Sequence, residues 1–483
     1  NNKWMGKTLF SVLMVMGVLC HGQQPIHNFQ NRNGAIDDYV EHLMERQGIP
    51  GVALAIIKDD SIRYEKNVGW ANLEHQVPIS DHSIFRLYSL TKPIVSVGIF
   101  QLIEEGKVHL DDVVSKYVFD VPDSWGNIQV KHLLSHSSGL PDMAPLPDFR
   151  ELSEQEVKDK IFGQDIGFEP GAKYGYNQTG FWLLQKIIEK VTGETLSEFI
   201  LKNQFAFGKH TFFSSDSRDI VLNRVTPYFP FEKGTLMIDH SYLQGNYAHA
   251  KNGLNITMGE FIQWDQRLNG HRLLNTASMD AMWELFPYAL SRKKFAYGWD
   301  QHNVNGHISY GFTGSLCTAY RVFPKQGLRI IFLSNGLSNW YNLDNSINHI
   351  ASLVDPDMVD VNNLAFETLL RASFERNDSG FETEYQKTRA HPHFGDNDFE
   401  MHLNDVGYFW LLSLKDPEKA VQVFELNARE FPNSWNVFDS LAEAFEKSGD
   451  SKKAIHNYER AMALNRDAAY RTRTKLKIEG LKE

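Results

Sequence analysis

The sequence predicts an α+β body built on one antiparallel sheet, followed by an all-α, repeat-like C-terminal domain. Three observations lead to this prediction: strand patterns occur early and late in the body, helical patterns lie between them, and apolar residues recur every 34 residues near the C-terminus. Early and late strands that close one sheet are typical of α+β folds. The chain has 483 residues, of which 42% are hydrophobic, and can therefore bury a sizeable core.

Residues 1–22 are expected to be a secretory signal peptide. Lys3 and Lys7 precede an apolar run that ends at Cys20, and small residues follow it. A membrane span needs about 20 apolar residues, and neither this run nor any later stretch is that long. We therefore expect an exported, periplasmic or extracellular chain without a membrane span. Lipid attachment at Cys20 is the less favoured alternative, because Leu19 is too bulky for the usual lipobox.

Residues 23–365 are predicted to form the body. The apolar run 52–57, a polar turn and the returning segment 62–64 predict a strand-turn-strand unit. Apolar residues between positions 91 and 106 form a wide helical stripe, which predicts a core helix. The run 328–333, bounded by turn residues, predicts a buried late strand. The early and late strands are expected to lie in one sheet.

The C-terminal part is predicted to consist of a linker, 366–400, and a helical domain, 401–483. Much of the linker is polar and poor in periodic apolar residues. Beyond it, Ala420 and Ala454 are separated by 34 residues, as are Phe424 and Tyr458. This is the period of the tetratricopeptide repeat. Two copies are too few for a free-standing array, so two alternatives stay open: a helical cap docked on the body, or a groove that binds a peptide.

Composition excludes several kinds of partner. The chain has 49 basic and 60 acidic residues, a formal charge of −11, and an acidic body is a poor binder of nucleic acid. His391, His393 and His402 have no carboxylate or cysteine at ligand spacing, so no metal is expected. No nucleotide-binding motif is present, and no cofactor is expected. The expected partner is a small-molecule or short-peptide substrate.

Two serines, Ser89 and Ser291, precede a lysine by three residues. Ser291 lies in a basic polar run, which is typical of a solvated surface. Ser89 opens the predicted core helix, and residues three apart are neighbours on a helix surface, so Lys92 should lie beside it. Lys92 could accept the serine proton only if burial lowered its pKa from about 10.4. The alternative is that Ser89 only caps the helix and Lys92 lies on the surface.

Three segments of the sequence favour a catalytic role for Ser89 and Lys92 over the helix-cap alternative. Residues 85–93, 132–141 and 170–180 resemble the conserved blocks of the serine β-lactamase-related hydrolases, which include class C β-lactamases, D,D-peptidases and many esterases. The resemblance covers residues 35–355 and implies a β-lactamase/transpeptidase-like body, an antiparallel sheet with flanking helices plus a helical region. Some members of the family carry a similar C-terminal extension.

The resemblance implies roles for four residues. Ser89 would be the acylated nucleophile and Lys92 its proton acceptor. Tyr176 matches the tyrosine that shares proton transfer to the serine and to the leaving group. The segment 311–315 matches the strand beside the nucleophile, so the backbone N–H groups of Ser89 and Ser315 would form an oxyanion hole.

The substrate-facing positions depart from the family pattern in two places. Gln178 stands where the family usually has asparagine, and its amide can still hydrogen-bond. Phe312 stands where the family has lysine or histidine, before the retained pair Thr313 and Gly314. The loss of this charge should weaken recognition of a substrate carboxylate. A glycine at position 314 is expected because a substrate must approach that edge strand closely.

The sequence therefore predicts an exported serine hydrolase that forms an acyl-enzyme on Ser89 and cleaves an ester or an amide, with esters favoured. One alternative is a β-lactamase or D,D-peptidase that acts on cell-wall-like substrates. The other is a binding protein whose site has decayed and whose helical tail carries the function.

Overall fold

The computed structural model of the chain describes residues 29–118, 120–146, 151–230, 235–240, 244–336, 343–395 and 398–482. The expected signal peptide, 1–22, lies outside these ranges. Within them, no helix combines the length and the apolar character that are needed to cross a bilayer.

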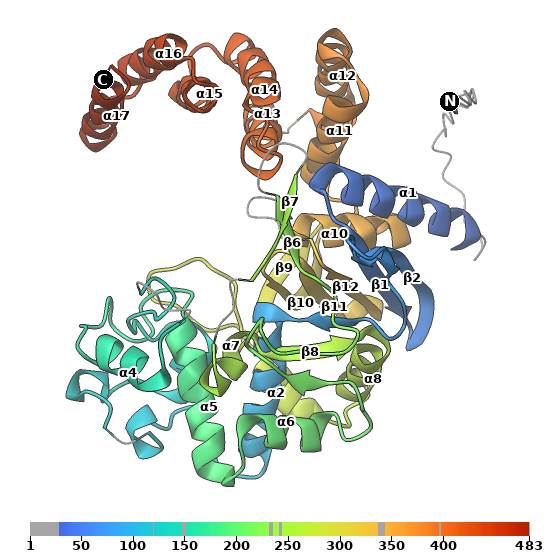
Figure 1. Cartoon of the computed structure of the whole chain (residues 1–483), viewed down its shortest axis with the longest axis vertical. Helices are drawn as coiled ribbons and strands as arrows, with labels where there is room; N and C mark the ends of the chain where they lie inside the picture. Colours follow the sequence, from blue (N-terminus) through green and yellow to red (C-terminus); the bar gives the residue numbers. More distant parts are fainter. Residues whose placement is uncertain are drawn as a thin grey trace.

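A seven-stranded antiparallel sheet forms the centre of the body (Figure 1). The early strand β1 pairs with the late strand β12, with Leu54 opposite Phe332, so the two ends of the body close one sheet. The predicted fold class is confirmed. In spatial order the strands are β3 (Val77–Pro78), β2 (Ser61–Asn72), β1 (Gly51–Lys58), β12 (Leu328–Ser334), β11 (Thr318–Phe323), β10 (His307–Gly314) and β9 (Asp300–Val304).

Helices cover both faces of this sheet, which explains why β1 is apolar from Val52 to Ile57. Side chains alternate between faces along a strand. The even-numbered residues of 52–56 pack in one apolar cluster with α1 and α10, and the odd-numbered residues of 53–57 pack in another with α2 and α8. A strand buried on both faces needs no polar alternation. The covering helices are α1 (Phe29–Gln47), α10 (Leu343–Val354), α2 (Thr91–Glu104), α8 (Met258–Asn269) and α9 (Thr276–Met282).

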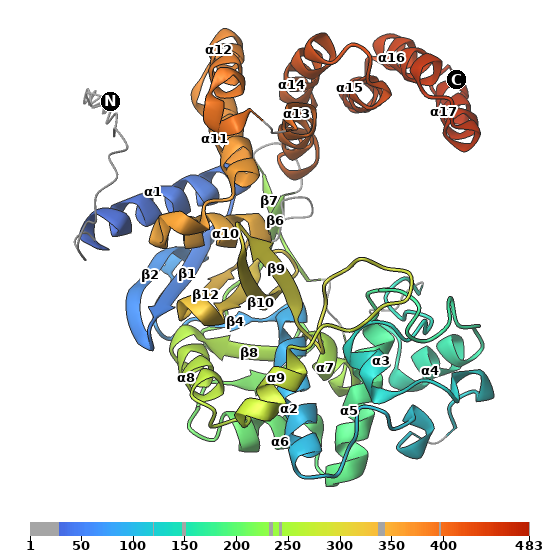
Figure 2. The same ribbon diagram turned by 180° about the vertical axis from the view of Figure 1, so that it is seen from behind.

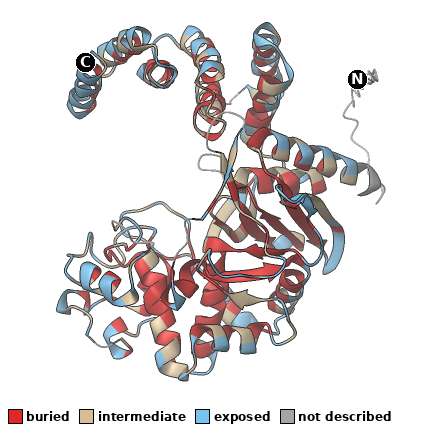
Figure 3. Ribbon diagram, in the orientation of Figure 1, coloured by how far each residue is buried: buried red, intermediate tan, exposed pale blue. Residues whose placement is uncertain are grey.

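The helix α2 is enclosed between the sheet and a second group of helices (Figure 3). Every residue from Thr91 to Phe100 is buried, as expected of a helix with apolar residues on all sides. A small sheet leads into α2, because only residues 87–90 separate its strand β4 from the helix. The second group of helices is α3 (Val130–Leu134), α4 (Glu154–Phe162), α5 (Gln178–Thr192), α6 (Leu196–Gln204) and α7 (His249–Asn252). The small sheet has the order β4 (Ile84–Arg86), β8 (Leu254–Thr257) and β5 (Phe212–Phe213), and a separate hairpin is formed by β6 (Tyr228–Pro230) and β7 (Leu236–Ile238).

The C-terminal region is a curved series of helices that extends away from the body (Figure 2). Residues 34 apart occupy equivalent positions in two of them: Ala420 and Phe424 in α14, and Ala454 and Tyr458 in α16 share one apolar cluster. Their assignment to the tetratricopeptide repeat stays a prediction. The helices are α11 (Val361–Glu375), α12 (Asp378–Ala390), α13 (Phe399–Tyr408), α14 (Pro417–Glu430), α15 (Trp435–Ser448), α16 (Ser451–Leu464) and α17 (Ala468–Gly480).

The prediction of a linker at 366–400 is wrong, because most of this segment is helical. α11 runs through the predicted boundary at 365, and α12 follows it. Phe381 and Tyr385, one helical turn apart, are buried in the cluster that also contains Leu54 of β1. Polar residues on the other faces of α12 concealed this pattern. The first helices of the tail therefore dock on the body, whereas the more distal helices pack in separate clusters.

Candidate active site

Ser89 lies in a single 3₁₀ turn, Tyr88–Leu90, between β4 and α2, and is half-buried. The chain before it is held from two sides: the Leu87 N–H donates to the carbonyl of Leu254 at 2.8 Å, and the Thr318 hydroxyl donates to the carbonyl of Leu87 at 3.0 Å. Tyr88 has a φ of +50°, which is uncommon for a residue with a side chain and is concentrated at functional sites. This fixed turn determines where the Ser89 hydroxyl is presented.

Lys92 is completely buried in the first turn of α2. Its Nζ donates to Oε1 of Gln178 at 3.0 Å and to the carbonyl of Lys251 at 2.9 Å. It also lies 5.1 Å from the centroid of the Tyr176 ring. These contacts hold the amine inside the site and away from solvent.

Burial lowers the pKa of Lys92 from its usual 10.5 to about 7, against an opposing effect of the Asp142 carboxylate. Removing water from around an amine penalises its charged form, and a nearby carboxylate only partly compensates. The neutral amine is therefore a major form at neutral pH. A neutral amine can accept a proton.

Tyr176 joins this lysine to the serine. The Tyr176 hydroxyl donates to Oγ of Ser89 at 2.8 Å and accepts from Nε2 of Gln178 at 3.3 Å. A chain of hydrogen bonds thus runs from Lys92 through Gln178 and Tyr176 to Ser89, and among the described residues no hydrogen bond joins Lys92 to Ser89 directly. Burial raises the pKa of Tyr176 to about 12, so the phenol is neutral at pH 7.

Gln178, a predicted substrate-binding residue, is half-buried beside Lys92, and its contact with a substrate stays a prediction. Both polar atoms of its amide are engaged, on Lys92 and on Tyr176. The reason lies in the start of α5, where Asn177 caps the helix by accepting from the Gly180 N–H at 2.8 Å. The cap fixes the first residue of the helix beside the buried amine, and the longer side chain of glutamine reaches it.

A cavity of about 280 Å³ opens in front of Ser89. No lysine, arginine or histidine is among the described residues that line it. Phe312 stacks on Tyr176, with ring centroids 6.3 Å apart and an angle of 28° between the rings. The lining residues are Ser89, Tyr174, Tyr176, Asp300, Phe312, Thr313, Ser315, Leu316 and Asp344.

The end of β10 borders this cavity. β9 pairs with β10 only as far as Gly311, which leaves the edge of residues 312–314 uncovered among the described strands. The structure explains the glycine at position 314 in a different way from the sequence: a Cβ at this position would lie 2.0 Å from the carbonyl oxygen of Leu87. The strand therefore packs directly on the segment that precedes Ser89. Ser315, with a φ of +45°, follows in the turn to β11.

Two carboxylates in the cavity wall are held by cations behind it. Lys293 Nζ lies 2.8 Å from Asp300, and Arg321 forms an ion pair with Asp344. Burial raises the pKa of Asp300, but hydrogen bonds and charges from His302 and Lys293 outweigh it, and the net pKa lies below its usual value. Asp300 is therefore ionised at neutral pH, and the described lining of the cavity is acidic and aromatic.

The site residues that the sequence singles out come together around one cavity and one buried amine. The sequence profile of the beta-lactamase family matches residues 36–350. The chain belongs to this family. Members of the beta-lactamase family are serine hydrolases, and the C-terminal helices lie beyond the matched residues.

Individual relatives agree with this assignment. Penicillin-binding protein 4* of Bacillus subtilis is 26% identical over 332 residues, which are 63% of this chain and 72% of that protein. The octameric penicillin-binding protein homologue from Pyrococcus abyssi superposes with a TM-score of 0.59 at 23% identity, over 70% of this chain and 81% of that one. D-amino acid amidase from Ochrobactrum anthropi has a TM-score of 0.58 at 20% identity, over 68% of this chain and 98% of that one. The two structures support the beta-lactamase-family fold.

Sequence reasoning missed four acidic or basic residues of the site. Asp142 directly follows the block 132–141, so a longer block would have included it. Its Oδ1 accepts from the Gln178 N–H at 2.9 Å, and its charge acts on Lys92. Lys251 lies in no motif, and neither do the two carboxylates Asp300 and Asp344. The three residues outside the blocks reach the site only through the tertiary fold.

Proposed function

We propose that the protein is a hydrolase that forms an acyl-enzyme on Ser89 and transfers the acyl group to water, with neutral esters as its preferred substrates and amides next. The observation that carries this proposal is the 2.8 Å hydrogen bond between Tyr176 and Ser89, in a site where the amine of Lys92 is completely buried. A serine hydroxyl needs a group that takes its proton, and these two residues supply one.

In the proposed acylation, Oγ of Ser89 forms a bond to the acyl carbon, and the carbonyl electron pair moves to oxygen. The serine proton passes to the oxygen of Tyr176 as the phenol proton passes to neutral Lys92. The low pKa of Lys92 favours this path, because a charged lysine could not take the proton. Catalytic hydrogen bonds are often longer before substrate binds, and the phenol hydrogen of Tyr176, which points to Ser89 in this structure, has to swing toward the amine.

The backbone N–H groups of Ser89 and Ser315 are proposed to bind the oxyanion, since both residues border the cavity. Each such donor contributes about 3–4 kcal/mol in the transition state. When the bond to the leaving group breaks, the leaving atom takes the proton back from Lys92 through Tyr176. Water then hydrolyses the Ser89 ester by the same steps.

The lining of the cavity supports a substrate without a free carboxylate. Phe312 replaces the cation of the family pattern, so no described basic side chain in the lining can pair with a substrate carboxylate, and the carboxylates of Asp300 and Asp344 line the same cavity. Thr313 and Gly314 are proposed to contact the substrate along the uncovered edge of β10. The stacked rings of Tyr176 and Phe312 suit an apolar acyl or alkyl group.

A serine-reactive fluorophosphonate probe tests the nucleophile. We expect the probe to label the full chain on Ser89, with the modified peptide identified by mass spectrometry, and to leave Ser89→Ala unlabelled. Ser291→Ala is the matched control, because Ser291 also precedes a lysine by three residues and should not affect labelling. Labelling that survives in a folded Ser89→Ala protein would remove Ser89 from the proposal.

A β-lactamase or D,D-peptidase is the second candidate, and the similarity to a penicillin-binding protein favours it. Short-chain nitrophenyl esters and nitrocefin distinguish the two functions. We expect rapid ester cleavage and slow nitrocefin turnover, with Phe312→Lys shifting the ratio toward nitrocefin because a cation then faces the carboxylate. Rapid nitrocefin turnover with negligible ester cleavage would establish the second candidate.

The third candidate is a binding protein that acts through its tail. It predicts that the intact protein takes no probe, and the complete hydrogen-bonded chain from Lys92 to Ser89 argues against it. Export remains part of the proposal and rests on residues 1–22. N-terminal sequencing of the mature protein should begin at Gln23, and a lipid-modified Cys20 would contradict this.

A further inference from the structure

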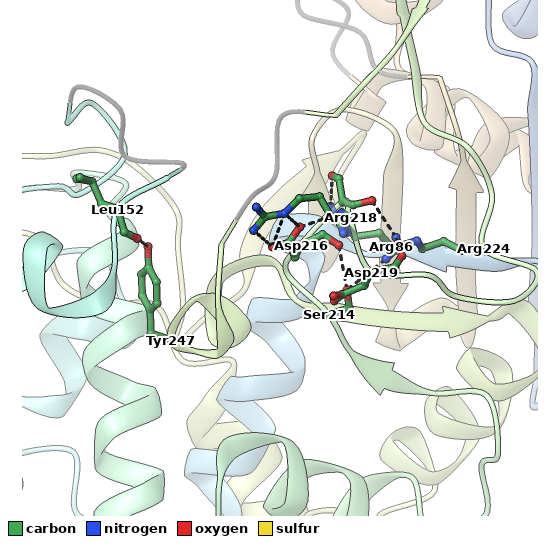
Figure 4. Close-up of polar contacts among 9 residues, drawn as sticks. Arg86, Leu152, Ser214, Asp216, Arg218, Asp219, Arg224 and Tyr247 are labelled. Carbon is green, nitrogen blue, oxygen red and sulfur yellow. Dashed lines mark hydrogen bonds and ion pairs between the residues drawn. The ribbon is translucent and has the colours of Figure 1, made fainter.

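Ser89 and Tyr176, the two ends of the 2.8 Å hydrogen bond, lie in segments that are supported differently. Ser89 follows β4, whose last residue, Arg86, lies among the side chains of the loop 214–224 and donates to Oγ of Ser217 at 3.5 Å (Figure 4). Tyr176 lies between α4 and α5 in a segment without helix or strand, and it lines the cavity. A phenol that transfers protons must be held within hydrogen-bond reach of its partners, so this segment needs support from behind.

His136, in the segment between α3 and α4, supports the chain on both sides of Tyr176. Its carbonyl accepts from the Gly175 N–H at 2.8 Å, and Nδ1 of its ring accepts from the Asn177 N–H at 3.2 Å. One histidine therefore holds the two residues that flank Tyr176. With a φ of +53°, His136 has a backbone conformation that is uncommon for a residue with a side chain and is concentrated at functional sites.

The ring of His136 also packs against the phenol. The ring centroids of His136 and Tyr176 are 4.6 Å apart, with an angle of 53° between the rings. His136 is 1% exposed and is not among the described residues that line the cavity, so it does not reach a substrate. Three further aromatic rings enclose it, with centroids at 5.3 to 5.8 Å, those of Tyr174, Phe181 and Phe295. This close packing behind the phenol restricts its movement away from Ser89.

The hydrogen bond from Asn177 determines which nitrogen of His136 carries the proton. Nδ1 accepts, so the proton of the neutral ring is on Nε2. A second proton, on Nδ1, would point at the Asn177 N–H. Burial, reinforced by the charge of Lys92, holds the pKa of His136 well below 6.5. His136 therefore offers the same acceptor across the neutral pH range.

We propose that His136 is the positioning residue of Tyr176: it holds the backbone on both sides of the phenol and the ring from behind, so that the Tyr176 oxygen stays within reach of Ser89 and Lys92. This inference rests on the proposed acylation, in which Tyr176 carries a proton between these two groups. A displacement of about 1 Å in such a site costs about a hundredfold in rate. Because His136 does not reach the cavity, it should affect the rate of acylation and not the affinity for substrate.

His136→Leu and His136→Asn test the acceptor, because leucine and asparagine have the same branching and only asparagine places an oxygen near the position of Nδ1. We expect His136→Leu to lower the maximal rate of fluorophosphonate labelling by about tenfold to a hundredfold, with the probe concentration at half-maximal rate unchanged. His136→Asn should be faster than His136→Leu by about fivefold or more, because the Asn177 N–H is paired again.

His132→Leu is the matched control. His132 is also buried, and its Nδ1 accepts from the Gln129 N–H at 3.1 Å, but in the described part of the chain no hydrogen bond or ring contact joins it to residues 175–177. It should destabilise the protein to urea and leave the labelling rate of the folded protein unchanged. An equal loss of rate in His132→Leu, or equal rates in the two His136 variants, would overturn the proposal.

The tautomer of His136 provides a second test, which decides if His136→Leu fails to fold. In ¹⁵N NMR of the histidine-labelled protein, the signals that are absent from His136→Asn should report a neutral ring protonated on Nε2 between pH 5 and 9. A proton on Nδ1, or titration in this range, would overturn the proposal without any measurement of activity. The two failures are distinguishable, because an unmodified protein that takes no label refutes the proposed function and leaves the tautomer as it is.

Discussion

The pH dependence of acylation should report the titration of Lys92. Its pKa of about 7 implies that the amine is mainly neutral above pH 8 and mainly charged below pH 6. Only the neutral form can take the Ser89 proton. The rate of acylation should therefore rise with pH and level off above the pKa, rather than rise throughout the accessible range.

The expected magnitude follows from the protonated fraction. Relative to the plateau, the rate should be about half at pH 7, about tenfold lower at pH 6 and about a hundredfold lower at pH 5. His136 cannot supply this midpoint, because burial, reinforced by the charge of Lys92, holds its pKa well below 6.5. Tyr176 cannot supply it either, because its pKa is raised to about 12.

The assay is the rate of fluorophosphonate labelling, or kcat/KM for a nitrophenyl ester, between pH 5 and 9.5. Lys92→Met should lower the plateau rate by about a hundredfold to ten-thousandfold. Lys294→Met, in the second Ser-x-x-Lys sequence, should leave the profile unchanged. A rate that keeps rising tenfold per pH unit through pH 9 would refute the reasoning, since it would indicate a lysine with an ordinary pKa.

Three further changes test the surrounding structure. Gln178→Leu removes the link between Lys92 and Tyr176 and should lower the acylation rate by about tenfold or more. The midpoint of the pH profile should move to lower pH, because the charged amine loses a hydrogen-bond acceptor. An unchanged profile would contradict the role of Gln178. The pKa of Lys92 is lower in the folded protein than in the unfolded chain. Burial of the amine therefore lowers the free energy of unfolding by its full amount below pH 7, and this penalty disappears as pH rises to 10.5. Lys92→Met should therefore stabilise the fold by up to about 5 kcal/mol at pH 6 and by clearly less at pH 9, as urea unfolding can measure; a pH-independent difference would contradict the shifted pKa. Gly314→Ala places a methyl group 2.0 Å from the Leu87 carbonyl and should lower the melting temperature by several degrees and abolish labelling, whereas Gly259→Ala, in open space on α8, should do neither.

The parts of the fold that the sequence predicts are those with a local signal. β1 and β12 are apolar runs bounded by turn residues, and α2 has an apolar stripe wide enough to indicate burial on all sides. The pairing of these two strands was predicted because one lies early and the other late in the body. The linker was mispredicted because α12 buries only a narrow face, and a polar composition outweighs so few apolar positions.

The site could be predicted only as far as its motifs extend. Ser89 and Lys92 are three residues apart, and the short turn that leads into α2 brings them into one site. Lys251, whose carbonyl holds the amine, is 159 residues further along the chain, and no periodicity connects the two. The inward orientation of Gln178 depends on how Asn177 caps α5, which is a matter of tertiary contacts with the loop that contains Leu140.

The part of the chain that matches the family is shorter than the part that packs around the central sheet. The family match stops at residue 350, but the apolar layer over the outer face of the central sheet continues through α11–α14 as far as Leu426. A protein shortened at residue 350 would expose that layer to water as a contiguous apolar surface and would tend to self-associate.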